Sequence, residues 1–425
     1  MSAGEIITVV SVPFFTGAIG YVTNWTGVWM LFEPLEFKGI HIPGLSKLVR
    51  IMPRRIQQIP GIMSGGLGWQ GIIPSRAAKM GSIAVDKGIA KVGSAKDFYE
   101  QLDPERITEH ILASARGEIR DMVERTMQRD HPELWSDLPP RLRERVHQRV
   151  EEQLPEIVEN VTGELGTHID HLLDVKLMVI RTIENDPALS NRIFRAIGRK
   201  ELRLIINLGF LFGFLFGIPT AVVTEVVFPN AWWLLPICGV VIGWVTNWLA
   251  IWMIFEPVEP KRILGLRWQG LFLKRQKEVS DVYSLIIADE VVTLRHIGDE
   301  LMHGAQSDRT RQLVESAMRP AVDRAAGSAR PLIRVAVGTR EYDELRESVA
   351  TEAVDYTIRP MQDADFNRVQ AKRVRELIRE RMREMSHKDF SEMLRTVIRE
   401  DEWLLYLHGA VLGLGGGLIH LAIFG

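Results

Sequence analysis

Two Thr-Asn pairs lie inside apolar segments of this sequence, Thr23-Asn24 in the first segment and Thr246-Asn247 in the third. An Asn amide surrounded by hydrocarbon needs hydrogen-bond partners, so each pair must face another helix or a polar cavity. The pairs therefore either line a polar intramembrane site or join helices, with each hydrogen bond contributing about 1 kcal/mol. The sequence alone leaves both roles open.

Two carboxylates end the same apolar segments, Glu33 and Glu256, and each is followed by proline. A carboxylate at the C-terminus of a helix opposes the helix dipole, so a partner cation would explain its presence. Arg76 and Arg275 are candidate partners for two such ion pairs, because each could fold back towards the end of its segment. Exposure of both glutamates to water would explain them equally well, and exposed pairs contribute little.

The sequence contains no Walker A loop, no G-x-S-x-G segment and no H-E-x-x-H segment. Residues 66–71 match the dinucleotide pattern G-x-G-x-x-G, but they follow no predicted strand. In the related segment Arg267 replaces the middle glycine, where it would block a pyrophosphate. Cys238 is the single cysteine. We therefore expect no catalytic residues, no cofactor, no metal and no nucleic-acid partner.

The elements that must position these residues are four apolar segments without Lys or Arg. They are residues 6–32, 204–228, 231–255 and 403–424. Each is long enough to cross a hydrocarbon layer of about 30 Å as a helix. The first has no basic region before it and no small-residue cleavage site, so we expect it to be retained. The sequence therefore predicts four transmembrane helices.

Positive charge orients these helices. Every Lys and Arg lies between Lys38 and Arg203 or between Lys261 and Arg399. Positive residues close to span ends stay in the cytoplasm. We therefore expect both long segments to be cytoplasmic and both termini to lie outside. The net charge of −2 indicates little about partners.

The chain contains a segment that recurs. Residues 20–34 and 243–257 are identical at ten of fifteen positions. The sequence therefore predicts an internal duplication with both copies entering the membrane from the same side, which is a parallel repeat. Two further patterns occur twice in the chain. One is a Trp-Gln-Gly segment, and the other is a row of three glycines at every fourth position. They are Trp69, Gln70 and Gly71 with Trp268, Gln269 and Gly270, and Gly209, Gly213 and Gly217 with Gly409, Gly413 and Gly417.

Each recurring set has a predicted role. Glycines at this spacing allow close helix approach in a membrane, so we expect packing seams within the bundle or between protomers. The Trp-Gln-Gly segments lie in apolar, glycine-rich loops flanked by basic residues such as Arg54 and Arg262. Such loops either lie in the cytoplasmic interface, where each basic residue gains about 1 kcal/mol from anionic headgroups, or only set the topology.

The long segments between the spans carry helical stripes. Ile107, Ile111, Ala115 and Ile119 form one of them, and Leu154, Val161 and Leu165 belong to another. Helix packing is the expected use of these stripes, ahead of an exposed lipid-binding face. The predicted segments are 1–33 for the first span, 34–203 for one helical lobe, 204–256 for the second and third spans, 257–402 for another lobe, and 403–425 for the last span.

These motifs together resemble a known family. Gly-x-x-Thr-Asn-Trp with Met-x-Phe-Glu-Pro, the Trp-Gln-Gly segments, and the run from Leu394 to Trp403 before a glycine-rich last span are similar to a bacterial membrane family. It is catalogued as domain of unknown function 445. The resemblance covers essentially the whole chain. It implies placement in the bacterial inner membrane and a mainly helical body, and it implies no catalytic residues.

The sequence thus predicts an all-α membrane protein: four spans in an internally duplicated bundle, with two elongated cytoplasmic helical lobes. Our first hypothesis for function is a non-enzymatic scaffold that forms homo-oligomers and contacts membrane lipid, including anionic headgroups, because its long amphipathic helices exceed what anchoring needs. The alternative is an oligomeric channel or transporter for a small solute or lipid, with the Thr-Asn pairs lining the pathway. A membrane enzyme is the third hypothesis. No protein partner is identified.

Overall fold

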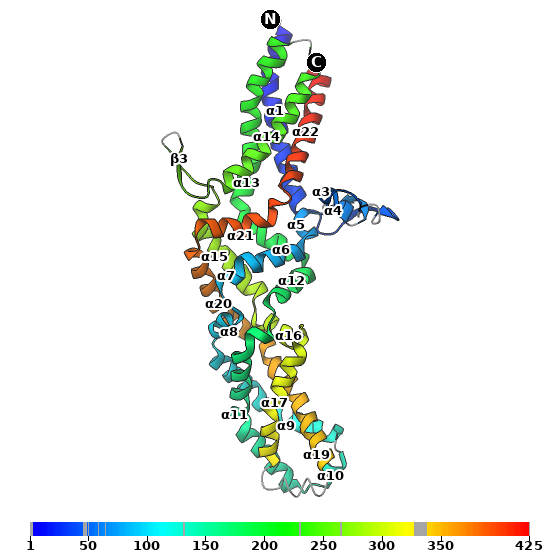
Figure 1. The fold of residues 1–425 in the computed structure, drawn as a ribbon, viewed down its shortest axis with the longest axis vertical. Coiled ribbons are helices and arrows are strands. Elements are labelled where there is room, and N and C mark those ends of the chain that lie inside the picture. The colour runs from blue at the N-terminus through cyan, green and yellow to red at the C-terminus, as the bar shows by residue number, and fades with distance from the viewer. Residues whose placement is uncertain are drawn as a thin grey trace. The chain divides into compact units, whose positions relative to one another are not determined.

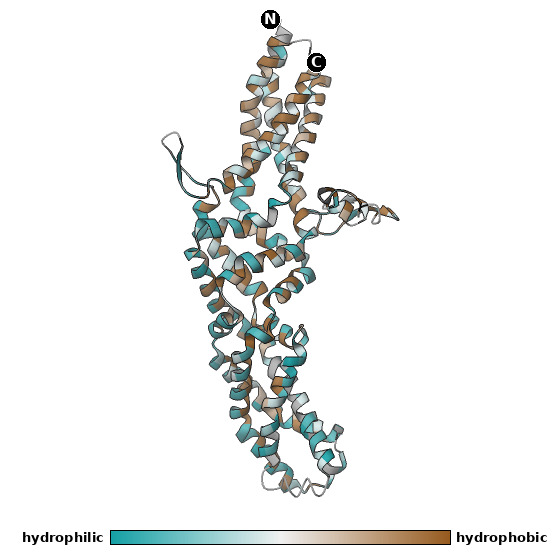
Figure 2. Cartoon of the chain, in the orientation of Figure 1, coloured by the Kyte–Doolittle hydropathy of each residue, from teal (hydrophilic) through white to brown (hydrophobic). Residues whose placement is uncertain are grey.

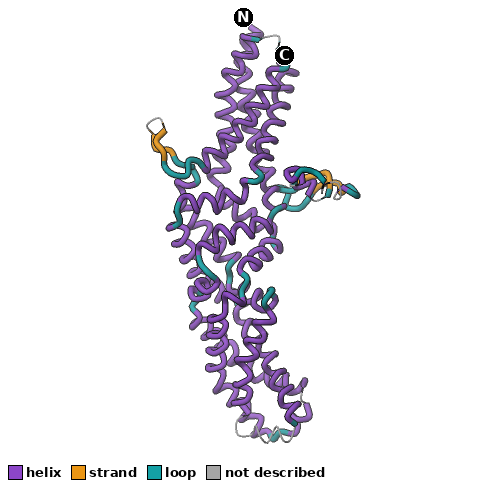
Figure 3. The backbone as a smooth tube through the Cα atoms, in the orientation of Figure 1, coloured by secondary structure: helices purple, strands orange, loops and turns teal. Residues whose placement is uncertain are grey.

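The computed structural model describes residues 3–45, 49, 51–57, 59–63, 65–130, 132–228, 231–263, 266–326 and 338–424. These residues are almost entirely helical (Figure 3). The strands among them belong to two short antiparallel hairpins, which the sequence did not indicate. The expectation of an all-α protein is therefore confirmed apart from these two hairpins.

The chain divides into two compact units that cut across the predicted segments. The first unit combines residues 1–88, 183–283 and 382–425, and the second combines 89–182 with 284–381. Residues of both predicted lobes, 34–203 and 257–402, occur in both units. Both contribute helices to the second unit, because the apolar stripes of the two segments share one core.

Four long helices form the body of the first unit. They are α1 (Ala3–Phe32), α13 (Pro187–Ala221), α14 (Leu234–Phe255) and α22 (Glu402–Phe424). Helix α1 packs along α13, and α14 packs along α22 (Figure 1). The helices are largely hydrophobic over this body (Figure 2). Val12, Ala221 and Leu235 form a buried cluster where helices from both pairs meet.

Three helices of the described residues are long and apolar enough to cross a membrane. They are Pro187–Val227, Leu234–Phe255 and Glu402–Phe424. The predicted first span is the exception, although α1 is a continuous helix of 30 residues. The count is therefore three where the sequence predicted four.

The remaining elements of the first unit are short. They are β1 (Lys38–His41), α3 (Arg54–Gln57), α4 (Pro60–Met63), β2 (Gly66–Trp69), α5 (Ile72–Ser75), α6 (Ala77–Ala84), β3 (Lys261–Ile263), β4 (Leu266–Trp268), η3 (Leu273–Arg275) and α21 (His387–Arg399). Strand β1 pairs with β2, and β3 pairs with β4. Each hairpin follows the end of a long helix, α1 or α14, so each lies at that end of the four-helix body (Figure 1).

The second unit is a helical body with its own core. It contains α7 (Ala90–Val92), α8 (Ala95–Gln101), α9 (Pro104–Asp130), α10 (Pro132–Asp137), α11 (Pro140–Leu172), η4 (Ile287–Val291), α16 (Leu294–His303), α17 (Ser307–Ala326), α19 (Thr339–Ile358) and η6 (Arg359–Gln362). Elements with residues in both units are η1 (Val85–Ile89), α12 (Val175–Asn185), α15 (Gln276–Ile286) and α20 (Ala364–Glu384).

The predicted helical stripes build the core of this second unit. Ile107, Ile111 and Ile119 on α9 are buried, as are Val161 and Leu165 on α11. Helix α11 packs against α9 and α17, and α9 also packs against α19. The stripes therefore serve helix packing, as expected. Helix α9 begins at Pro104, directly after Asp103, whose carboxylate accepts a hydrogen bond from the Arg106 amide at 3.4 Å.

Candidate functional site

The two Asn side chains bridge the paired helices. The Asn24 amide on α1 donates a 2.6 Å hydrogen bond to the main-chain oxygen of Ile205 on α13. The Asn247 amide on α14 donates a 2.6 Å bond to the oxygen of Leu405 on α22. Both Asn residues are buried. Each side-chain amide therefore donates a hydrogen bond across its helix pair.

The glycine rows lie at the same two helix crossings. A side chain at Gly209 would collide with the Gly20 oxygen and the Asn24 amide, and one at Gly213 would meet the Thr16 oxygen. The α14–α22 crossing repeats this arrangement, because Gly409 faces Gly243 and Gly413 faces Gly239. Gly217 and Gly417 lie against Pro13 and Pro236 in the same way. Both rows are thus packing seams within one chain, where only glycine lets the backbones approach so closely.

The Thr partners face the space between the two helix pairs. Thr23 and Thr246 are almost fully buried, and the Thr246 hydroxyl donates to the Gly243 oxygen at 3.2 Å. Earlier on α1, the Thr16 hydroxyl donates to the main-chain oxygen of Gly213 at 2.9 Å. These hydroxyls therefore satisfy main-chain carbonyls while their side chains line the centre of the bundle.

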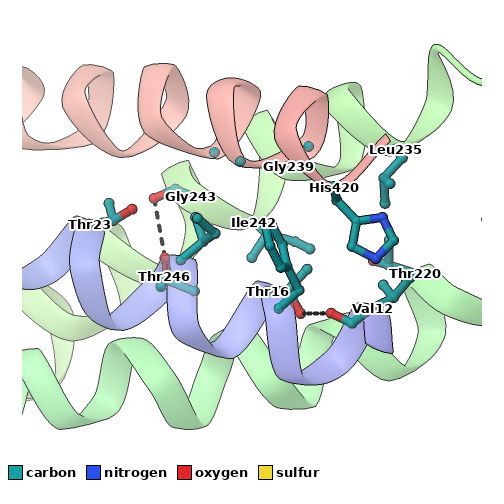
Figure 4. A pocket seen from close by; sticks show the side chains of 16 residues that line it. Val12, Thr16, Thr23, Thr220, Leu235, Gly239, Ile242, Gly243, Thr246 and His420 are labelled. Carbon is teal, nitrogen blue, oxygen red and sulfur yellow. Dashed lines mark hydrogen bonds between the residues drawn. The ribbon is translucent and has the colours of Figure 1, made fainter. Parts of the chain in front are cut away.

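A small cavity of about 30 Å³ lies in this centre (Figure 4). Its lining takes matching positions from both halves of the sequence: Gly20 with Gly243, Ile19 with Ile242, Thr23 with Thr246, and Thr220 with His420. The volume is enough for one or two water molecules and far too small for an organic solute. The walls are mostly apolar side chains and glycine, with hydroxyls and one imidazole as the polar groups.

His420 is a polar lining residue that the sequence reasoning missed. Its Nε2 lies 3.1 Å from the Ser11 hydroxyl, and its ring packs edge-on against Phe15 at 5.1 Å. His420 is 3% exposed. The signal that could have found it is the 200-residue shift that relates the glycine rows, because this shift places His420 opposite Thr220.

The two span-end carboxylates have partners other than those predicted. Glu33 pairs with Arg195 at 2.6 Å, and Glu256 pairs with Arg395 at 2.5 Å. The predicted pairs with Arg76 and Arg275 therefore do not form. The reason is packing: the end of α1 lies beside the early turns of α13, so the cation nearest to Glu33 comes from that helix.

Arg76 and Arg275 instead reach the other half of the chain. Arg76 pairs with Asp401 at 2.5 Å, and both side chains are buried, at 6% and 2% exposed. Arg275 pairs with Glu201, which is also buried. Burial raises the pKa of the Asp401 carboxyl to about 6, against the opposing pull of the Arg76 guanidinium and the Lys79 ammonium. The partners in each pair are far apart in the sequence, so no local pattern predicted them.

The Trp-Gln-Gly segments close the hairpins onto the ends of α1 and α14. The Gln70 amide donates to the Leu35 oxygen at 2.8 Å, and the Gln269 amide donates to the Val258 oxygen at 3.1 Å. The amides of Gly71 and Gly270 donate to the oxygens of Pro34 and Pro257. The indoles of Trp69 and Trp268 donate to the oxygens of Met30 and Glu256 at 3.3 and 3.4 Å. These residues therefore anchor the loops, and the exposed side chains lie further out on the hairpins.

Among the described residues, no group of three or more His, Cys, Asp or Glu side chains is arranged to hold a metal ion.

One curated protein provides a distant match. The sequence is 28% identical to the UPF0754 membrane protein GK0639 of Geobacillus kaustophilus (strain HTA426) in a 137-residue alignment that covers 29% of this chain. The match spans 36% of that protein's length, about a third. This similarity and the apolar helices support a membrane protein of an uncharacterised family.

Neither of the other comparisons adds a relative. No family model matches the sequence, so the resemblance to the family of domain of unknown function 445 is not confirmed. No solved structure matches either.

Proposed function

We propose that this protein is a non-enzymatic scaffold of the bacterial inner membrane, built from two repeated halves and able to associate with itself. The observation that carries the proposal is the use of its intramembrane polar groups. The side-chain amides of Asn24 and Asn247 donate to main-chain oxygens of the neighbouring helix, so these donors contribute to the stability of the bundle.

The internal duplication is supported by contacts that recur. The first half (residues 1–228) and the second half (residues 231–425) use the same hydrogen bond, with Ile205 replaced by Leu405 as acceptor. The carboxylate partner Arg195 is likewise replaced by Arg395. Both replacements shift the residue number by 200, as the glycine rows do. Independent helices would have no reason to repeat these contacts in register.

A fourth span follows from this duplication. Helix α1 makes with α13 the contacts that α14 makes with α22, including the Asn bond and the glycine crossing. Since α14 is apolar enough to span a membrane, we infer that α1 spans it as well, with its polar side chains covered by α13. Both chain ends lie at one end of this body and both hairpins at the other (Figure 1). The basic residues follow the hairpin end, so we place that end in the cytoplasm and the termini outside.

The proposal includes contact with membrane lipid because the two hairpins expose apolar and basic side chains. Ile40 and Leu67 are direct cross-strand partners, and they are 76% and 65% exposed. Arg262 and Arg267 are cross-strand partners in the second hairpin and are both exposed. Two cations directly opposite each other repel, and phosphate would relieve the repulsion. We infer that the hairpins lie in the headgroup layer, where Ile40 meets acyl chains and Arg262 meets anionic headgroups.

The mass of the purified protein tests the scaffold. Chains reconstituted into lipid nanodiscs should contain more than one copy per particle, and anionic lipid should co-purify and be detected by mass spectrometry. A particle with a single chain at all protein concentrations would contradict self-association. Loss of anionic lipid in an Arg262→Gln/Arg267→Gln variant, with wild-type retention in Lys96→Gln, would assign the lipid to the second hairpin.

A conduit is the second candidate function, and the central cavity favours it. The cavity lies between the two helix pairs and carries hydroxyls and the His420 imidazole. At about 30 Å³ it could pass only water or protons without widening. His420→Phe would fill the cavity, so proton flux into liposomes should fall in that variant and not in Leu418→Phe, whose side chain is 48% exposed on the same helix. Equal flux in both variants and in empty liposomes would exclude the conduit.

A membrane enzyme is the weakest of the three candidates. The proposal predicts that purified protein turns over none of a broad set of lipid and nucleotide substrates, and any reproducible turnover would overturn it.

A further inference from the structure

Two ion pairs with buried carboxylates connect the two halves within the first unit, and they have the same polarity. Arg76 of the first half pairs with Asp401 of the second, and Arg275 of the second half pairs with Glu201 of the first. The basic partner follows the last glycine of the Trp-Gln-Gly segment by the same number of residues in both halves, Gly71 to Arg76 and Gly270 to Arg275. The acidic partner precedes the glycine row in both halves. These inner pairs would therefore form equally well between any two halves.

The neighbouring outer pairs have opposite polarity. Lys79 of the first half pairs with Glu400 of the second. At the matching contact, Glu278 of the second half pairs with Lys200 of the first at 2.6 Å. Positions 79 and 278 correspond through the same shift that relates Arg76 to Arg275, and positions 200 and 400 correspond through the glycine rows. The base and the acid have thus been exchanged between the two contacts.

This exchange makes like halves incompatible. If a first half met another first half in the same geometry, Lys79 would face Lys200. If a second half met another second half, Glu278 would face Glu400. A third contact acts in the same direction, because Lys87 pairs with Glu392 at 2.6 Å, and the first-half position that corresponds to Glu392 is Arg192.

We propose that these outer charges are a pairing code: each half of this protein accepts the other half and disfavours a second copy of itself. The inference rests on the duplication stated in the proposed function. It goes beyond that function because it identifies the partner that each half selects. In this arrangement the inner pairs and glycine crossings supply contacts common to all pairings, and the outer charges supply the discrimination.

Each outer contact adds only a small free-energy difference between pairing with the other half and pairing with a like half, and these differences add over the contacts. The side chains of Lys79 and Glu400 are 43% and 51% exposed, and those of Lys200 and Glu278 are 65% and 46% exposed. Exposed pairs gain little, and like charges at the same distance lose a similar amount. Glu278 also accepts a 2.8 Å hydrogen bond from Arg275 of its own half, and the Arg275 guanidinium and the Lys200 ammonium together lower the pKa of Glu278 to about 2.

Single reversals in the full-length chain reproduce each mismatched pairing. Lys79→Glu places a second carboxylate against Glu400, as two second halves would. Glu278→Lys places a second ammonium against Lys200, as two first halves would. Each single reversal should lower the midpoint of thermal unfolding in detergent by about 1 to 3 °C, and the shift should shrink in high salt. Lys96→Glu, which reverses an exposed ion pair of the second unit, should lower it less.

Reversal of the partner is the decisive control. Lys79→Glu/Glu400→Lys restores opposite charges and should recover most of the lost midpoint. Glu278→Lys/Lys200→Glu should recover only part of it, because Arg275 loses its 2.8 Å pair with Glu278 and faces a cation at that position. Failure of Lys79→Glu/Glu400→Lys to recover, or single variants that unfold like wild type, would overturn the pairing code. The nanodisc mass measures the scaffold separately: a monomeric wild-type protein with intact rescue would reject self-association and keep the code.

Discussion

The side-chain amide of Asn247 lies 2.6 Å from the main-chain oxygen of Leu405, at the point where Gly243 and Gly409 bring their helices together. The hydrogen bond and the glycine contact depend on each other. The hydrogen bond forms only when the two backbones are this close. If the helices separated, the Asn247 amide would lose its acceptor. The crossing of α1 with α13 repeats the relationship with Asn24 and Ile205.

Replacing Asn247 by Leu should therefore weaken the α14–α22 crossing. The variant loses one intramembrane hydrogen bond, so we expect the free energy of unfolding to fall by about 1 kcal/mol, and by about twice that in Asn24→Leu/Asn247→Leu. Chemical unfolding in mixed micelles, followed by tryptophan fluorescence, measures the change. Unchanged stability together with lost liposome flux would instead indicate a pathway role.

The glycine crossing gives a second prediction with a control on the same helix. A methyl group at Gly409 would collide with the Gly243 oxygen, so Gly409→Ala should destabilise the protein by about 1 to 3 kcal/mol. At Gly415 nothing lies within 4 Å of the added methyl group, and Gly415→Ala should be neutral or stabilising by up to about 1 kcal/mol. Similar effects of the two substitutions would argue against the seam.

The buried carboxyl of Asp401 predicts a pH dependence. Because its pKa is raised to about 6 in the folded protein and is near 4 in an unfolded chain, the folded state takes up a proton first as the pH falls. This group therefore contributes more stability at pH 5 than at pH 7, by about 1 kcal/mol. The contribution is lost as the pH rises through 6. Comparing the unfolding of wild type and Asp401→Asn at pH 5 and 7 isolates this contribution, because the variant has no titrating carboxyl at position 401. An equal pH response in both proteins would assign the dependence to other groups.

The sequence predicted the elements better than their partners. Apolar length identified the helices that contain Asn247 and His420, and the stripe with Ile107 and Ile111 predicted the core face of α9. These features depend on residues close together in the chain. The Glu33–Arg195 and Arg76–Asp401 pairs join residues far apart, and no local pattern distinguishes the true partner from another arginine in reach.

The two compact units combine residues of both predicted lobes for the same physical reason. The amphipathic patterns of α9 and α17 predict that one face of each helix is buried, but they do not identify the segment that covers it. The sequence therefore assigned them to separate lobes, whereas they share one compact unit. The hairpins escaped detection because their strands have only three or four residues, several of them glycine.

The exposed hairpin pair gives the last prediction. Ile40 and Leu67 expose apolar surface next to the end of α1, which costs free energy in water and gains it among acyl chains. In a Cys238→Ala background, an environment-sensitive dye on Ile40→Cys should be quenched by lipids with quenchers in the acyl chain. The same dye on Arg262→Cys, in the basic hairpin, should be quenched better by headgroup quenchers. A dye at position 40 that responds only to a water-soluble quencher would place the hairpin outside the bilayer, and the exposed pair would then need another partner.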